Sequence, residues 1–227
     1  MLRITTRNVP KCIYECQAQP ILNGRIRTIS QWISDLKALL PKDPKIRQVG
    51  DPMLREAAEP VDLSFIHSPD LKAMVERMIK KMRSHNGAGI AAPQIGVGLQ
   101  VIAMEYTGKH IKKLKDDGFS DKELRRMGIA LVPLKVFINP RLKIIDPLML
   151  AFREGCLSVE GYSALVPRAK EVEVSALDLS GSPVTWRAAG WPARILQHEV
   201  EHLKGNLFID SMLFKTFMND KWTKYTE

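Results

Sequence analysis

The spacing of apolar residues predicts a long helix that begins at Pro69. Ser68 is placed to cap its first turn, and proline is well tolerated at the first position of a helix. From Leu71 to Met82, apolar residues recur every three or four positions, which gives one continuous stripe on a helix. We interpret this methionine-rich stripe as core packing rather than as an adaptable binding face.

Strands are predicted over much of the rest of the chain. Residues 99–105 have the pattern of a buried strand, and 178–183 suit a hairpin turn because Gly181 and Pro183 favour one. A second helix is predicted over 191–204, with Pro192 in its first turn and Gly205 after its end. Few strands alternate with helices, so the elements predict an α+β fold with mixed or antiparallel strands around a central helix. The other predicted strands are 135–139, 141–145, 171–177 and 184–188, with a loop running through Gly155.

The segment 107–128 is highly charged and rich in lysine. We interpret it as a surface insertion with one short helical turn that starts at Ser120 or Asp121. A basic loop that binds a partner is the alternative, although charged runs are more often simply solvated.

Composition limits the class of protein. The chain has 227 residues, of which 45% are hydrophobic and 26% charged, as in an ordinary globular domain. No apolar stretch is long enough to span a bilayer. Three cysteines (Cys12, Cys16 and Cys156) cannot form a disulfide framework, which favours a reduced, intracellular protein.

The excess positive charge is concentrated near the N-terminus. The whole chain carries +9, and residues 1–34 contain five basic residues against the single acid Glu15. A segment rich in arginine and poor in acids is typical of an organellar transit peptide, although a merely basic tail has the same composition. We therefore predict an organellar transit segment over 1–34, followed by a single domain over 35–227.

The second predicted helix carries the strongest chemical signal, His198-Glu-Val-Glu-His202. Residues four apart share one helical face, so His198 and His202 can bind one metal ion. Glu199 lies where its carboxylate can reach water on that ion, which is the arrangement of a metal hydrolase.

A third ligand is needed, and the common metallopeptidase patterns do not supply one. Phe208 stands where one class has a third histidine, and only Glu227 is available as the distant glutamate of the other. Cys156 lies in a polar loop after Gly155, so we favour it as the third ligand. One thiolate and two imidazoles suit iron(II), zinc, cobalt or nickel, and the residues do not choose among them.

Three ordered motifs resemble those of the peptide deformylases, over roughly residues 46–217. They are Gly87-Ala-Gly-Ile-Ala-Ala-Pro-Gln94, Glu154-Gly-Cys-Leu-Ser158 and Gln197-His-Glu-Val-Glu-His202. The runs Ser158–Tyr162 and Gly190–Leu196 are most similar to the organellar branch. Together with the basic N-terminus, this resemblance implies a catalytic domain that works in the mitochondrial matrix. This resemblance implies a deformylase fold built around a metal-binding helix, and removal of the formyl group from formyl-methionine on nascent peptides.

The resemblance also implies roles for individual residues. Cys156, His198 and His202 would hold the metal, and Glu199 would exchange protons with the attacking water and the leaving amine. Oxyanion donors would be the Gln94 side chain and the Leu157 backbone N–H. The peptide backbone would lie in extended form near Gly89 and Gly161. The pocket for the methionine side chain would include Ala88, Gly89, Trp191, Arg194 and Ile195.

Some positions depart from the family pattern. Glu201 stands where the family usually has aspartate, and we expect it to pair with Arg194 or another basic residue. Ala88 replaces a larger aliphatic residue and should widen the pocket mouth. We expect the Glu201→Asp substitution to leave activity intact or to raise it.

Two other functions remain open at the level of sequence. One is a metallopeptidase that cuts peptide bonds, and the other is a catalytically weak deformylase-like protein with a binding role. We expect no specific nucleic acid partner, and we expect at most transient contact with the ribosome.

Overall fold

The structure is a computed structural model that describes residues 43–226. Its main element is an antiparallel sheet with the strand order β1-β2-β3-β4-β5, to which β6 adds by pairing with β4. The strands are β1 Gly89–Ala91, β2 Val101–Tyr106, β3 Val132–Cys156, β4 Val159–Leu177, β5 Pro183–Ala189 and β6 Met218–Asn219. The α-helices are α2 Pro69–Ser84, α3 Gly108–Asp116, α4 Asp121–Arg126, α5 Trp191–His202 and α6 Phe208–Ser211. Short 3-10 helices span Pro52–Arg55, Leu63–Phe65, Ala92–Ile95, Phe214–Thr216 and Trp222–Tyr225.

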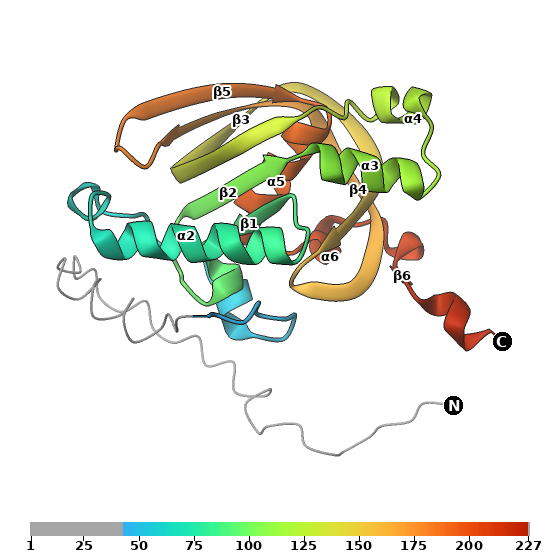
Figure 1. Cartoon of the computed structure of the whole chain (residues 1–227), viewed down its shortest axis with the longest axis horizontal. Coiled ribbons are helices and arrows are strands. Elements are labelled where there is room, and N and C mark those ends of the chain that lie inside the picture. Colours follow the sequence, from blue (N-terminus) through green and yellow to red (C-terminus); the bar gives the residue numbers. More distant parts are fainter. Residues whose placement is uncertain (1–42, 227) are drawn as a thin grey trace, which may run out of the picture.

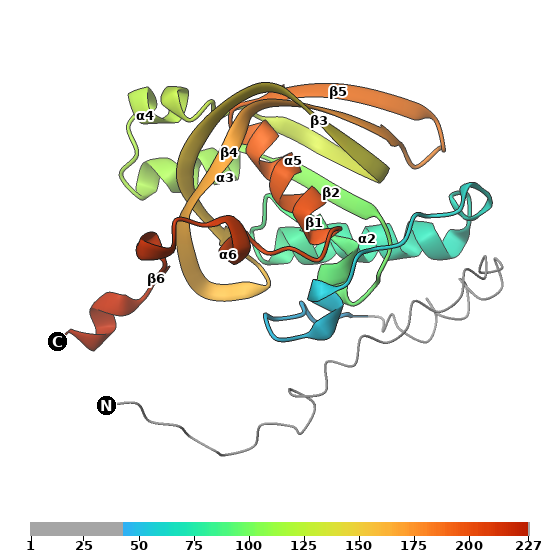
Figure 2. The same cartoon turned by 180° about the vertical axis from the view of Figure 1, so that it is seen from behind.

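The sheet separates two packed layers (Figures 1 and 2). Alternate residues of β2 face opposite sides, as the pleat of a strand requires. Val101 and Ala103 pack in the cluster that contains the buried stripe of α2, whereas Ile102 and Met104 pack with α5. Both faces of β2 are therefore covered, which explains why its sequence has a continuous apolar run instead of an alternating pattern. The α+β class with antiparallel strands around a central helix is confirmed.

The first long helix starts where the sequence indicates. Ser68 Oγ accepts a hydrogen bond from the backbone N–H of Leu71 at 3.1 Å, and Pro69 occupies the first turn. The buried positions of α2 are Leu71, Met74, Val75, Met78 and Met82, so the stripe is core packing.

The two central strands are longer than predicted. Residues 135–139 and 141–145 belong to one strand that continues through the expected loop at Gly155, and β4 starts at Val159 instead of residue 171. Pro140 and Pro147 lie inside this strand, and the ladder accommodates them where its register shifts, between Ile138 and Arg141 and between Asp146 and Met149. The strands β3 and β4 bend together around α5 (Figure 2).

The charged segment 107–128 holds two helices instead of one short turn. The expected start at Ser120 is correct, because its side chain and that of Glu123 form a capping box at the start of α4. The helix α3 was missed because its residues are mostly charged and none of them is fully buried, which favoured the interpretation as a solvated insertion. The helix α5 ends at His202, two residues earlier than expected.

In the described part of the chain, no helix combines the length and the apolar character needed to cross a membrane. The proposed transit segment over 1–34, with Cys12 and Cys16, lies outside the described residues.

Candidate metal and active site

The helix α5 presents both predicted histidine ligands to one site. His198 and His202 lie four residues apart, and their ring centroids are 5.0 Å from each other. His202 is buried and His198 partly buried. Because α5 packs against the sheet, both imidazoles are largely shielded from solvent.

Cys156, at the end of β3, completes the cluster. Its Sγ lies 3.3 Å from His202 Nε2, and the donor atoms of Cys156, His198 and His202 all lie within 4.8 Å of one another. The backbone N–H of Ser158 and the side-chain amide of Gln94 also point at the sulfur, at 3.4 and 3.5 Å. The structure thus brings together the three predicted ligands from two distant segments.

The protonation pattern of this cluster fits a divalent cation. Burial alone would lower the pKa of His198, but hydrogen bonds to Cys156 and Glu154 raise that pKa well above its usual range. Burial and the neighbouring His198 hold the pKa of His202 well below its usual range, so this imidazole is neutral. A cation bound here would compete with protonation of His198, because metal binding requires the ligand atoms in their deprotonated forms.

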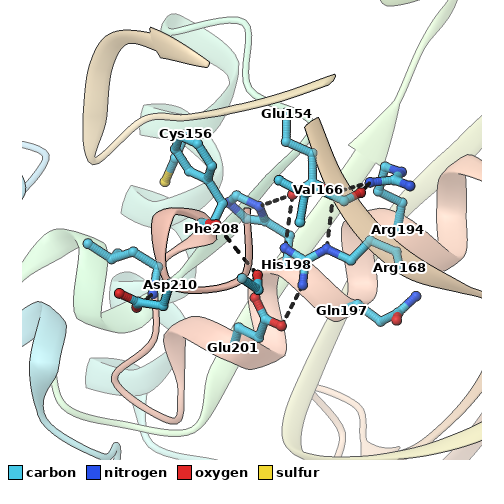
Figure 3. Close-up of polar contacts among 12 residues, drawn as sticks. Glu154, Cys156, Val166, Arg168, Arg194, Gln197, His198, Glu201, Phe208 and Asp210 are labelled. Carbon is cyan, nitrogen blue, oxygen red and sulfur yellow. Dashed lines mark hydrogen bonds and ion pairs between the residues drawn. The ribbon is translucent and has the colours of Figure 1, made fainter. Parts of the chain in front are cut away.

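A buried ionic network orients His198 from behind (Figure 3). Glu154 Oε2 accepts from His198 Nδ1 at 3.0 Å and from Arg168 Nη2 at 2.9 Å. Glu154 Oε1 accepts from Arg168 Nε at 3.0 Å and from Arg194 Nη1 at 2.6 Å. Although burial would raise the pKa of Glu154, bonds from His198 and Arg168 hold it well below its usual range. Glu154 is therefore a carboxylate that fixes the ring and tautomer of a metal ligand.

The basic partner of Glu201 is Arg168, the second of the two alternatives expected from the sequence, and not Arg194. Its carboxylate lies 2.5 Å from Arg168 Nη1 (Figure 3). Arg194 is unavailable because it binds Glu154 and donates to the carbonyl of Val166 at 2.8 Å.

Glu199 is buried beside the cluster. Burial raises the pKa of Glu199 to about 7, and among the described residues its Oε2 has no hydrogen-bond partner. A Cβ atom on Gly89 would lie only 2.7 Å from Glu199 Cδ, so glycine leaves the room that this carboxylate occupies. A carboxylate with a near-neutral pKa can both accept and return a proton at neutral pH.

Gln94 is held rigidly next to the sulfur. Its Oε1 accepts from the backbone N–H of Ala91 at 2.8 Å, and its Nε2 donates to Ser158 Oγ at 3.2 Å. Both contacts are buried, and the short 3-10 helix Ala92–Ile95 positions the side chain.

A cavity of about 450 Å³ opens onto these groups. It is lined by every residue predicted for catalysis or substrate binding, and by two of the three predicted metal ligands. The predicted residues in its lining are Ala88, Gly89, Gln94, Cys156, Leu157, Gly161, Trp191, Arg194, Ile195, His198 and Glu199.

Comparisons with known proteins agree with this geometry. A model of the polypeptide deformylase family matches residues 44–216. The chain belongs to the polypeptide deformylase family. It is 41% identical to human mitochondrial peptide deformylase over 82% of this chain and 75% of the human protein. It is 42% identical to chloroplastic peptide deformylase 1A of Solanum lycopersicum, over 77% of this chain and 61% of that protein.

Solved deformylases share the fold. A class I type b peptide deformylase from Acinetobacter baumannii superposes with a TM-score of 0.64 at 30% identity, over 75% of this chain and 99% of that one. The enzyme from Synechococcus elongatus, in complex with actinonin, gives 0.61 at 32% identity, over 76% and 80% of the two chains. The protein is thus an enzyme, and deformylases remove the N-formyl group from nascent peptides.

Several residues of the deformylase site escaped the sequence analysis. Glu154 stood inside a recognised motif, two residues before a ligand, which was an available signal. Arg168 had none, because its partners are distant in sequence. Other residues that were not predicted also line the cavity, among them His110, Lys113 and Leu114 of α3, Asp117 just after that helix, and Asp220 of the C-terminal segment.

The edge of the sheet near Gly161 is partly occupied. The carbonyl of Gly161 accepts from the backbone N–H of Asp220 at 2.9 Å, and β6 pairs with Tyr162 and Ser163. In the strand order of the described sheet, β1 is a terminal strand, so Gly89 lies on an edge.

Proposed function

We propose that this deformylase hydrolyses the formyl group of formyl-methionyl nascent peptides at a metal centre held by Cys156, His198 and His202. The proposal rests on the cluster in which the Cys156 sulfur lies close to the imidazoles of His198 and His202, beside the buried Glu199. The donor set suits iron(II), zinc, cobalt or nickel. A bound divalent ion supplies Lewis-acid polarisation of the formyl group and of the attacking water.

Glu199 moves the protons. Its pKa of about 7 lets it take a proton from the attacking water and pass that proton to the leaving amine. Gln94 Nε2 and the Leu157 backbone N–H donate hydrogen bonds to the negative charge that develops on the formyl oxygen. Both residues line the cavity beside Cys156, which supports this assignment.

The substrate backbone adds in extended form at the β1 edge near Gly89. Gly161 contributes to the same cavity, although its carbonyl already binds Asp220. The methionine side chain enters the part of the cavity lined by Ala88, Trp191 and Ile195, with Arg194 behind them.

We also propose that residues 1–34 are a mitochondrial transit segment and that 35–227 are the catalytic domain. The enzyme would then work in the matrix, with transient ribosome contact. The basic N-terminus and the organellar relatives support this location. A fluorescent fusion of the full chain should colocalise with mitochondria and lose that location without residues 1–34.

Formate release from formyl-Met-Ala-Ser, with metal content measured, tests the chemistry. Wild type should release formate and hold one metal ion per chain. Glu199→Ala should keep the metal and lose about 10²–10⁴-fold in kcat, because a general acid–base group contributes that much. Cys156→Ser should lose the metal. Glu76→Ala, an exposed carboxylate on α2, is the matched control.

Cleavage of unformylated Met-Ala-Ser would instead identify a peptidase. Metal-loaded wild type that releases no formate would contradict the proposed activity. A deformylase-like protein with a binding role would then be the remaining alternative.

A further inference from the structure

The helix α3 forms part of the cavity wall, although nothing in the proposed chemistry uses it. Its residues Lys113 and Leu114, and Asp117 just after its end, line the same cavity as Ala88 and Trp191. The segment that the sequence marked as a solvated insertion therefore borders the cavity, and Figure 1 shows where α3 lies in the fold.

The start of this segment is fixed to Trp191 through aromatic contacts. His110 Nδ1 accepts from the backbone N–H of Thr107 at 3.0 Å, which caps the first turn of α3. The His110 ring stacks on Tyr106 with centroids 4.8 Å apart, and Tyr106 meets Trp191 edge-on at 6.3 Å. Such ring pairs hold defined relative orientations.

The end of the segment is fixed to the same tryptophan through the backbone. The carbonyl of Gly128 accepts from the backbone N–H of Trp191 at 3.2 Å. A Cβ atom on Gly128 would lie 2.8 Å from Gly190 Cα, and both glycines have positive φ, +65° and +63°. Only glycine permits this approach of two backbones. The insertion is thus anchored at both ends beside one residue of the predicted methionine pocket.

Leu114 is the apolar residue that α3 contributes to the cavity lining. It is half-buried and packs against the cluster that contains Tyr106 and Ile195, as Ala88 and Trp191 also do. Its neighbours on the cavity side of α3, Lys113 and Asp117, are charged and exposed. Leu114 thus adds an apolar residue to the cavity lining that includes Ala88 and Trp191, next to charged residues of the same wall.

We propose that Leu114 is a specificity-determining residue: with Trp191 it forms the outer wall of the pocket for the apolar side chain of the substrate's first residue. This inference rests on the proposed function. The small Ala88 leaves one side of that pocket wide, and α3 supplies the surface that limits it.

Substitutions that change the volume of Leu114 test the proposal. Leu114→Ala should increase the ratio of kcat/KM for formyl-Phe-Ala-Ser over formyl-Met-Ala-Ser by about 10-fold, the usual effect of a few methylenes in an apolar pocket. Leu114→Trp should raise the KM for formyl-Met-Ala-Ser about 10-fold with kcat nearly unchanged, because it removes binding and not chemistry. Lys112→Ala, exposed on the same helix and outside the cavity, is the matched control.

Binding of the product Met-Ala-Ser, measured by calorimetry, gives a readout that does not depend on turnover. Leu114→Trp should weaken it about as much as it raises KM. If both Leu114 variants keep wild-type melting temperatures, substrate preference and product affinity, the proposal is overturned. A third outcome separates the two proposals: wild type binds the product, Leu114→Trp does not, and neither releases formate. The proposed activity would then be wrong, whereas the role of Leu114 in the pocket wall would be supported.

Discussion

Glu154 Oε2 lies 3.0 Å from His198 Nδ1, and two guanidinium groups hold the same carboxylate from other directions. All of these groups are largely buried, so the carboxylate orients a metal ligand without help from water. The geometry couples the stability of the domain to the quality of its metal site, because one side chain serves both.

The Glu154→Gln substitution should therefore weaken metal affinity by about 10–100-fold, as the loss of a hydrogen bond behind a ligand does. It should also lower the free energy of unfolding by about 3–5 kcal/mol, because Arg168 and Arg194 would remain as buried cations without their shared anion. Competition with a chelator and denaturant unfolding measure the two effects. Unchanged metal affinity would show that His198 needs no such support.

The Glu201→Asp substitution should leave kcat unchanged or slightly raised. Arg168 keeps both of its bonds to Glu154 through Nε and Nη2, so shortening Glu201 affects only Nη1. The Glu201 side chain is 28% exposed, and partly solvated pairs contribute only about 0–1 kcal/mol. Steady-state formate release and the melting temperature are the measurements. A large loss of activity would assign Glu201 a role of its own.

Local sequence signals predicted the parts of the fold that depend on neighbours in the chain. Ser68 and Pro69 marked the start of α2, and the spacing of His198 and His202 marked the metal-binding face of α5. The same reasoning divided β3 into separate strands and placed a loop at Gly155, because only the partner strand shows that the ladder continues through its register shifts.

The residues of the candidate site also fall into two groups. Those inside compact motifs could be predicted from the sequence, whereas Arg168 and Leu114 take part through contacts between distant segments, which no local pattern indicates. The charged character of α3 suggested a solvated face, and that face exists, but His110, Lys113 and the apolar Leu114 reach the cavity.

The ion pair between Arg83 and Glu105 should make stability depend on pH. Arg83 Nε donates to Glu105 at 2.7 Å, and this bond lowers the pKa of Glu105 below its ordinary value of 4.5. A carboxylate whose pKa is lowered by folding stabilises the protein above its unfolded pKa, and this contribution disappears as pH falls through the folded pKa. Arg83→Met should thus cost up to about 1 kcal/mol at pH 7, since Arg83 is half exposed. The difference from wild type in urea unfolding should shrink below about pH 4, and a constant difference would contradict the assignment.

The Gly89→Ala substitution should abolish activity while the metal stays bound. The added Cβ would lie 2.7 Å from Glu199 Cδ and 2.8 Å from Glu199 Cγ, well inside van der Waals contact, so the carboxylate must move. Misplacing a general acid–base group costs about 10²–10⁴-fold in rate. The three atoms nearest to this Cβ all belong to Glu199 and none to Cys156, His198 or His202, so metal content should match that of wild type. Gly98→Ala is the control, because its nearest neighbour is the flexible side chain of Met53 at 3.7 Å. Formate release and metal analysis on the same preparations decide the matter: full activity in Gly89→Ala would mean that Glu199 does not need its present position to transfer protons.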